Sequence, residues 1–282
     1  METSALRMFR AVAETGSVSR AAERMNCVQS NVTARLRKLE DELDTPLFTR
    51  TARGMVPTPA GRVLQDYAHR LLGLVDEAAR AVRSVGLGGG PLALGSMETT
   101  AAVRLPAILA EFHRDYPDVD LSLITGNSEE MVQGVLDRRL DGALVGGSID
   151  HPDLASQVIY NEELVLVHDG DRAVKPVLLT FRRGCFYRAQ AERWLRESGR
   201  LPVRVMEFGT LDGILGCVSA GMGCTVLPRV VVEGPQYAGL VCFEPLPPAI
   251  AHAPTSLIWR TDAPDHPILR AFADYLGQHA RQ

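Results

Sequence analysis

The chain has 282 residues, of which 46% are hydrophobic and 23% charged, a composition typical of a globular protein with two or more domains. Its 30 basic and 34 acidic side chains give a formal net charge of −4, which excludes a uniformly basic, histone-like DNA binder. Residues 1–62 differ from the rest, because they hold ten basic and seven acidic side chains, a net charge of +3, whereas the remainder carries −7. This asymmetry favours an N-terminal module that faces an anion.

The distribution of charge and cysteine argues against several other classes. Charged side chains from Glu2 to Glu14 interrupt the first apolar positions, so no signal-peptide core is present, and no later apolar run approaches the ~18 residues of a membrane span. Five scattered cysteines lack the spacing of a zinc site or of a disulfide framework. We therefore expect a cytoplasmic protein without a membrane partner, a metal or a cofactor.

The first sixty residues predict a helix-turn-helix followed by a wing. Apolar residues recur at helical spacing over residues 6–13, a short helix is expected over 19–25, and a third helix runs from Val32 to Leu43 with basic residues on its other side. Two helices joined by a tight turn, the second of them basic, are typical of DNA-binding modules. The glycine and prolines of residues 46–61 suit a hairpin-like wing.

A long helix without internal proline is expected from about residue 60 to residue 84. Its apolar residues alternate spacings of four and three, which is the seam of a coiled coil and requires a partner helix. The seam consists of Leu64, Ala68, Leu71, Val75, Ala78 and Val82. The glycine-rich residues 86–91 predict a hinge after this helix.

Strands and helices alternate after the hinge, which predicts parallel sheets covered by helices on both faces. The roughly 190 residues after the hinge are enough for two such α/β units. Strands are expected at residues 91–96, 119–125, 142–145, 164–168, 177–180, 203–206, 224–227, 240–243 and 255–259, and helices at residues 99–115, 128–138, 186–198, 211–220 and 267–281.

The N-terminal string resembles the winged helix-turn-helix of LysR-type transcriptional regulators. The shared elements are Phe9, Gly16–Ser17, Ala21–Ala22, Gln29–Ser30, Val32–Thr33, Leu39–Glu40, Leu43, Leu47–Phe48, Arg50, Thr58 and Gly61. The long helix, the hinge and the α/β remainder also match that family. The resemblance implies an α/β protein with an all-α winged helix-turn-helix at residues 1–59, a dimerising linker helix at 60–85, a hinge at 86–91 and a periplasmic-binding-protein-like effector domain at 91–282. Lobe I of this domain would comprise residues 91–160 and 266–282, and lobe II residues 161–265.

Helix geometry predicts which side chains touch double-stranded DNA. A recognition helix enters the major groove by its N-terminal end, so Gln29, Ser30, Asn31 and Thr33 can reach base edges. The basic residues one turn further on, Arg35, Arg37 and Lys38, are expected to neutralise phosphates, and the family resemblance places Arg50 and Arg53 of the wing by the backbone or minor groove. The alternative is a solvated helix face. The resemblance also implies a homodimer or homotetramer on an interrupted palindrome, a small-molecule effector, and RNA polymerase as a further partner.

The family's effector pocket lies where strands run into helices, and hydroxyls at such junctions can hold a carboxylate. The matching residues are Ser96, Met97, Glu98, Thr99, Thr100, Asn127, Ser128, Gly146, Gly147, Phe186, Phe208 and Thr210. Each hydroxyl is also an ordinary helix cap. Glu98 would repel an anion if it pointed inward, and the two glycines would leave room for a larger effector.

Three alternatives remain beside an effector-controlled regulator. Cys185 is expected at a helix N-terminus near Arg182, Arg183 and Arg188, which would lower the pKa of its thiol and allow redox sensing, although the second cysteine of the peroxide sensors is absent. The segment around it, residues 181–195, could instead line the effector pocket or serve structural packing. An enzyme built on Ser96, His168 and Asp169 has no catalytic motif to support it. A purely architectural DNA binder would have no use for two α/β lobes.

Overall fold

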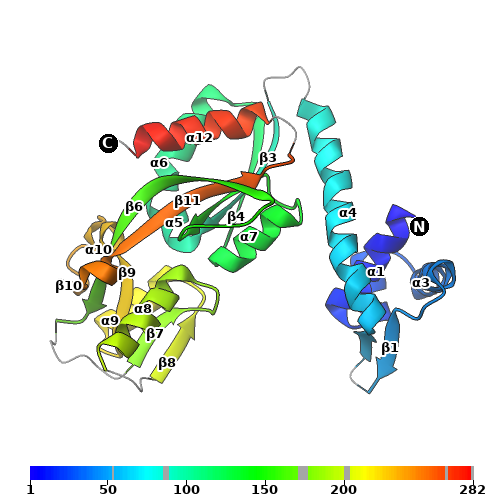
Figure 1. Ribbon diagram of the computed structural model, residues 1–282, viewed down its shortest axis with the longest axis horizontal. Helices are drawn as coiled ribbons and strands as arrows, with labels where there is room; N and C mark the ends of the chain where they lie inside the picture. The colour runs from blue at the N-terminus through cyan, green and yellow to red at the C-terminus, as the bar shows by residue number, and fades with distance from the viewer. Residues whose placement is uncertain (53, 85–88, 171–176, 200–203, 264–265, 281–282) are drawn as a thin grey trace. The chain divides into compact units, whose positions relative to one another are not determined.

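The computed structural model describes residues 1–282 except 53, 85–88, 171–176, 200–203, 264–265 and 281–282 (Figure 1). The chain divides into two compact units, Met1–Ala79 and Arg80–Gln282. The division falls inside one long helix, α4 (Pro59–Ser84), in the place where the sequence predicts the linker helix. Residues 86–88 of the expected hinge at 86–91 lie outside the described residues. None of the helices in the described part of the chain is long and apolar enough to cross a membrane.

Three helices of the N-terminal unit share one apolar core. Helix α1 (Thr3–Thr15) ends at Gly16, whose φ of 63° is left-handed, and α2 (Val18–Arg24) begins after Ser17, whose side chain accepts a hydrogen bond from Arg20 N at 3.4 Å. Helix α3 (Gln29–Leu43) follows after a short turn. The helices bury Phe9, Val12, Ala21, Val32 and Leu39. The predicted helix-turn-helix is therefore confirmed.

The wing is a two-stranded antiparallel hairpin of β1 (Phe48–Thr51) and β2 (Gly54–Pro57), as the sequence predicts. Gly54 has a φ of 114°, and a Cβ at this position would lie 2.4 Å from Gly16 O. Because Met55 N also donates to Gly16 O at 2.9 Å, this glycine lets the hairpin approach the end of α1 closely. The contact fixes the base of the wing on the helical core.

The C-terminal unit contains a mixed seven-stranded sheet, which corrects the expected parallel sheets. Strands β3 (Gly90–Met97), β4 (Val119–Gly126) and β5 (Gly142–Gly146) are parallel. Two long strands, β6 (Leu154–His168) and β11 (His252–Arg260), run antiparallel to each other, and β11 also pairs antiparallel with β5. The sequence predicts only residues 164–168 of β6, because polar residues interrupt the apolar pattern before them.

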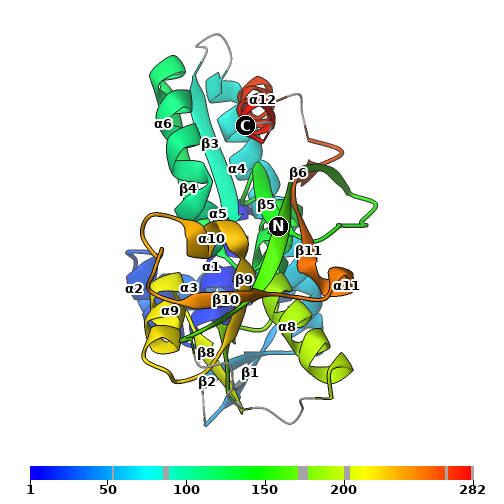
Figure 2. The ribbon, with the colours of Figure 1, turned by 90° about the vertical axis from the view of Figure 1, so that its left-hand side faces the viewer.

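Strands β6 and β11 connect the two lobes (Figure 2). The C-terminal part of β6 pairs with β9 (Thr225–Pro228) and β10 (Cys242–Pro245) in lobe II, where β7 (Val177–Phe181) and β8 (Arg204–Phe208) form a separate parallel pair. Since β11 lies beside β5, it belongs to the sheet of lobe I. Lobe I therefore resumes earlier in the chain than the expected residue 266.

Helices cover the strands of both lobes. Lobe I carries α5 (Glu98–Val103), α6 (Leu105–Asp115), α7 (Ser128–Leu136) and α12 (Pro267–His279), and lobe II carries α8 (Phe186–Glu197), α9 (Leu211–Ser219), α10 (Arg229–Glu233) and α11 (Pro248–Ala251). The helix expected over residues 99–115 is interrupted at Arg104, because Pro106 starts a new helix. Helices α10 and α11 are too short to leave a periodic signal in the sequence.

Candidate DNA-binding surface and effector pocket

The first turn of α3 presents polar side chains to solvent. Gln29, Ser30 and Asn31 are exposed, as expected for residues that reach base edges. Thr33 differs, because it is half-buried and its hydroxyl donates to Gln29 O at 3.0 Å. Three of the four predicted base-reading side chains are therefore available without rearrangement, and the Thr33 hydroxyl must first leave the helix backbone.

Val28 at the N-cap of α3 is a feature that the sequence analysis missed. Its side chain makes no capping hydrogen bond, and the residue is 68% exposed. Valine at an N-cap costs about 1 kcal/mol relative to serine or threonine, which accept from free N–H groups. The helix therefore begins with an apolar side chain that does not help it fold. An apolar residue in a polar first turn is the signal that would have singled it out.

The basic residues of the DNA-binding unit fall into two groups. Arg35 Nη1 lies 2.8 Å and Lys38 Nζ 3.0 Å from the two carboxylate oxygens of Glu2, and the hydrogen bond from Lys38, with that from Arg35, lowers the pKa of Glu2. Arg37 and Arg50 are exposed, and neither forms an ion pair with any residue that the structure describes. Arg53 lies outside the described residues. Among the predicted phosphate contacts that the structure describes, Arg37 and Arg50 are therefore the ones without an ion pair.

The predicted seam of α4 divides into two faces. Ala68 is fully buried in the core of the N-terminal unit and Leu64 packs against that core, so these two residues do not form an exposed dimer seam. Leu71, Val75, Ala78 and Val82 are exposed, as expected for residues that await a partner helix. Further exposed apolar side chains at helical spacing extend this face, namely Val63, Tyr67 and Leu74. The sequence predicted a single seam because α4 has two apolar faces, one packed on the N-terminal core and one exposed, and their residues follow one another at the same spacing.

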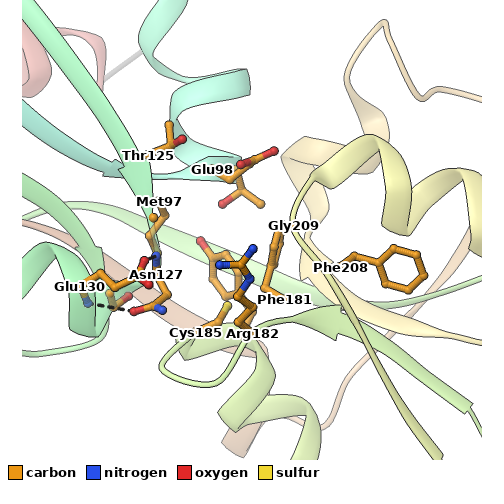
Figure 3. A pocket seen from close by; sticks show the side chains of 14 residues that line it. Met97, Glu98, Thr125, Asn127, Glu130, Phe181, Arg182, Cys185, Phe208 and Gly209 are labelled. Atoms are coloured by element: carbon orange, nitrogen blue, oxygen red, sulfur yellow. Dashed lines mark hydrogen bonds between the residues drawn. The ribbon is translucent and has the colours of Figure 1, made fainter. Parts of the chain in front are cut away.

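A cavity of about 230 Å³ lies in the C-terminal unit between the two lobes (Figure 3). Six of the predicted residues line it: Met97, Glu98, Thr99, Asn127, Ser128 and Phe208. Eight further residues line it: Thr125, Gly126, Glu130, Phe181, Arg182, Cys185, Tyr187 and Gly209. Gly126 and Gly209 belong to the expected strand-to-helix junctions, and four others belong to residues 181–195, for which a pocket role was one of the alternatives. The sequence did not indicate Thr125 and Glu130. The pocket therefore takes side chains from both lobes.

The remaining predicted pocket residues do not line the cavity. The list is Ser96, Thr100, Gly146, Gly147, Phe186 and Thr210. A Cβ at Gly146 or Gly147 would lie 2.8 Å or 2.7 Å from Phe186, so that aromatic side chain already fills the room expected for a larger effector. Ser96 is fully buried and donates to Met97 O at 3.0 Å, which also argues against its use as a nucleophile.

The helix N-termini at the pocket are largely occupied by the protein's own side chains. Asn127 and Glu130 cap α7 reciprocally, with Glu130 N donating to Asn127 Oδ1 at 2.8 Å and Asn127 N to Glu130 Oε2 at 3.1 Å. Thr210 caps α9 by accepting from Gly213 N at 3.2 Å. The alternative of helix capping is therefore confirmed for Thr210. Ser128 Oγ is also engaged, because it accepts from Gly146 N at 3.1 Å.

Two hydrogen bonds cross from lobe I to lobe II beside the cavity. Glu98 Oε1 accepts from Leu211 N at 3.1 Å, so a carboxylate of the protein itself lies at the N-terminus of α9. Asn127 Nδ2 donates to Arg183 O at 3.1 Å. Glu98 thus points into the cavity, where its carboxylate would repel an anionic group placed beside it.

The environment of Cys185 overturns the expected low pKa. Its thiol is buried at the N-cap of α8, and burial raises the pKa of the thiol, although backbone N–H groups of Arg188 and Tyr187 act in the opposite direction. The Arg188 side chain is directed to Glu207 at 2.6 Å and Glu192 at 2.7 Å and does not stabilise a thiolate strongly enough to reverse this. Desolvation therefore outweighs the nearby positive charge.

Tyr187 places a buried hydroxyl at the same end of the pocket. Burial raises the pKa of this phenol above its usual value, so it remains a neutral hydrogen-bonding group. It lies near the hydroxyls of Thr99 and Thr255, whose buried oxygens have no hydrogen bond of good geometry. The pocket wall therefore holds neutral polar groups beside its charged ones.

Two family models together match nearly the whole chain. The bacterial regulatory helix-turn-helix protein of the lysR family matches residues 3–62, and the LysR substrate binding domain matches residues 86–281. The chain belongs to the LysR family of transcriptional regulators. The DNA-binding unit and the two-lobed unit described above are thus the two modules of a LysR-type regulator.

Relatives and solved structures extend this likeness over the full length. The uncharacterized HTH-type transcriptional regulator YusT of Bacillus subtilis (strain 168) is 43% identical over 279 residues, which cover 97% of this chain and 95% of that protein. GltR, an HTH-type transcriptional regulator of the same organism, is 40% identical over 287 residues, covering 99% and 97%. The crystal structure of full-length CbnR complexed with its target DNA has a TM-score of 0.70 and 24% identity, covering 99% of this chain and 100% of that one. The similarity to CbnR concerns the fold.

Proposed function

We propose that this LysR-type regulator reads its operator through the first turn of α3. The proposal rests on the exposure of Gln29, Ser30 and Asn31, since amide and hydroxyl groups at that position match the hydrogen-bonding edges of bases in the major groove. Exposed Val28 adds an apolar contact to the methyl group of a thymine. Arg37 and Arg50 neutralise phosphates on either side of the groove.

The exposed apolar face of α4 supports a homodimer. Leu71, Leu74, Val75 and Ala78 lie at coiled-coil spacing and are uncovered in the single chain. A second copy of α4 would cover them and hold two α3 helices on one side of the DNA, so the operator is an interrupted palindrome. Pairing of dimers into a tetramer, contact with RNA polymerase and action in the cytoplasm, where bacterial DNA lies, complete the proposal.

The cavity between the lobes is the effector site of this proposal. It is lined by both lobes, and a ligand that contacts both favours their closed arrangement over an open one. Because α4 leads from the DNA-binding unit toward the effector domain in the sequence, a change in lobe closure would alter how the paired α3 helices engage DNA. The regulator therefore activates or represses transcription according to effector occupancy.

Selection of bound sequences from a random double-stranded DNA library tests the DNA-reading part. The full-length protein should enrich an interrupted palindrome with two equivalent half-sites. Gln29→Ala should enrich a half-site that has lost preference at one position, because one base contact is worth about 1–3 kcal/mol. Enrichment of no motif by the wild-type chain would overturn the proposed function.

A further inference from the structure

The effector cavity carries charges of opposite sign on its two lobes. Glu98 and Glu130 line it from lobe I, and Arg182 lines it from the segment between β7 and α8 of lobe II. Figure 3 shows the Arg182 side chain reaching toward the middle of the pocket, with Glu98 and Glu130 on other sides of the space. These are the three ionisable acidic and basic side chains of the lining, apart from the Cys185 thiol and the Tyr187 phenol.

Arg182 is available to a ligand. Within the part of the chain that the structure describes, its guanidinium makes no hydrogen bond and no ion pair. Arg188, six residues later, is instead buried and paired with Glu192 and Glu207. A free guanidinium presents a planar fork of N–H groups that matches a carboxylate.

The first turn of α8 adds to the preference for a carboxylate on the lobe II side. This helix of 12 residues begins at the pocket after Cys185, which provides no capping hydrogen bond, and has no acidic residue in its first turn. The backbone N–H groups of Tyr187 and Arg188 act on the Cys185 thiol in the direction that lowers its pKa, so this end of the helix favours negative charge. The other long helices at the pocket, α7 and α9, have caps of their own.

The lobe I side favours a cation. Glu98 uses Oε1 for Leu211 N and Glu130 uses Oε2 for Asn127 N, and within the described residues the second oxygen of each carboxylate accepts no hydrogen bond. An effector with negative charge alone would meet these two carboxylates at close range. An effector with positive charge alone would leave Arg182, the positively charged side chain of the lining, without a partner.

We propose that the effector is a small zwitterion of the α-amino acid class. Its carboxylate binds Arg182, and its ammonium group binds Glu98 and Glu130. The cavity of about 230 Å³ is smaller than the ~300–1,000 Å³ of sites for drug-sized ligands, which agrees with a metabolite of this size. Since the two charges of one molecule engage opposite lobes, binding draws the lobes together. This inference rests on the proposed function of the cavity as the effector site.

Calorimetric titration of the full-length protein tests the class of ligand. The probes are the common L-amino acids, each compared with the amine that lacks its carboxylate and with the acid that lacks its amino group. We expect at least one amino acid to bind, and both of its truncated analogues to bind at least about tenfold more weakly, because each loses a charge-assisted hydrogen-bonding group worth ~1.5–3 kcal/mol.

Charge-neutral variants assign each end of the ligand. Arg182→Gln should weaken binding of the amino acid about tenfold or more and leave the amine unaffected. Glu98→Gln and Glu130→Gln keep an oxygen acceptor for Leu211 N and for the capping box, so their loss of amino acid binding reports charge alone. Arg183→Gln and Glu129→Gln alter neighbouring exposed side chains that do not line the cavity and should bind as the wild type does.

Three results would overturn the inference: no amino acid binds, the simple acid binds as tightly as its amino acid, or Arg182→Gln binds the amino acid unchanged. The same protein preparation is tested on the DNA motif obtained by selection. Sequence-specific DNA binding without amino acid binding would contradict this inference and leave the regulator intact. Loss of sequence-specific DNA binding would contradict the proposed function itself.

Discussion

Val28 stands at the N-cap of α3, where serine or threonine would accept from the free N–H groups of the first turn. Its side chain is exposed and contributes nothing to the core in which Val32 and Leu36 of the same helix are buried. Val28 directly precedes the proposed base-reading residues Gln29 and Ser30, so we expect its side chain to contact DNA. Replacing Val28 by a capping residue should therefore raise the stability of the DNA-binding unit and lower its affinity for the operator.

Val28→Ser should stabilise the DNA-binding unit by about 1 kcal/mol through a new cap, and should weaken operator binding about fourfold through loss of ~0.8 kcal/mol per methyl contact. Thermal unfolding and fluorescence anisotropy measure the two effects. Replacing the contacted thymine by uracil should weaken the wild type to the same extent and leave the variant unaffected. Tighter operator binding by Val28→Ser would show that Val28 does not touch DNA.

Arg37 is exposed and has no ion pair with any described residue, so it can neutralise one phosphate without breaking an internal contact. Arg37→Ala should weaken binding to all sequences alike and lower the slope of log K against log salt concentration by about 0.9. Arg114→Ala, which removes an exposed arginine of the effector domain, serves as the control. A changed sequence preference with an unchanged salt slope would contradict the phosphate assignment.

The raised pKa of Cys185 predicts an unreactive thiol. A pKa above the usual thiol value lowers the thiolate fraction at neutral pH, and reactivity should rise only as pH increases toward that pKa. Mass spectrometry should show alkylation of Cys185 by iodoacetamide well after that of Cys242, which is exposed. Equal rates at pH 7 would revive the redox-sensing alternative.

At the scale of elements, regular periodicity was sufficient for α1 to α4 and for most strands and helices of the effector domain. The long antiparallel strand β6 was only partly predicted. Its polar residues Ser156, Gln157, Glu162 and Glu163 interrupt the apolar pattern by which a strand is recognised in the sequence. The expectation that pocket residues lie at strand-to-helix junctions correctly predicted Glu98 and Asn127, which line the cavity. The sequence could not predict that Arg182, and not Arg188, lines the cavity, because this depends on tertiary packing.

The two faces of α4 predict different outcomes for the same kind of substitution. Leu71→Asp places a charge on the exposed face and should weaken dimerisation at least about tenfold while the fold is retained, since burying one leucine contributes ~1.5–3 kcal/mol. Ala68→Asp places the charge in the core and should unfold the N-terminal unit. Analytical ultracentrifugation and circular dichroism separate the two effects. An unchanged dimer in Leu71→Asp would contradict the proposed interface.

At the scale of the whole molecule, one unit reads DNA and the other holds a cavity whose two walls come from different lobes. A ligand can shift lobe closure only by its difference in affinity between the open and closed arrangements. A zwitterion that engages Arg182 and the lobe I carboxylates together has such a difference, because an open cleft allows only one of these contacts. Coupling between sites of this kind is typically ~1–3 kcal/mol, enough to change operator occupancy severalfold or more.

The most direct test of the regulator's function is to map the DNA bound in the native host by crosslinking and sequencing, and then to footprint the strongest site. An effector-controlled regulator should occupy discrete sites upstream of operons, each with an interrupted palindrome whose half-sites are protected on one side of the helix. Diffuse occupancy of the genome without a common motif would contradict this function, because such a pattern is what an architectural DNA binder produces.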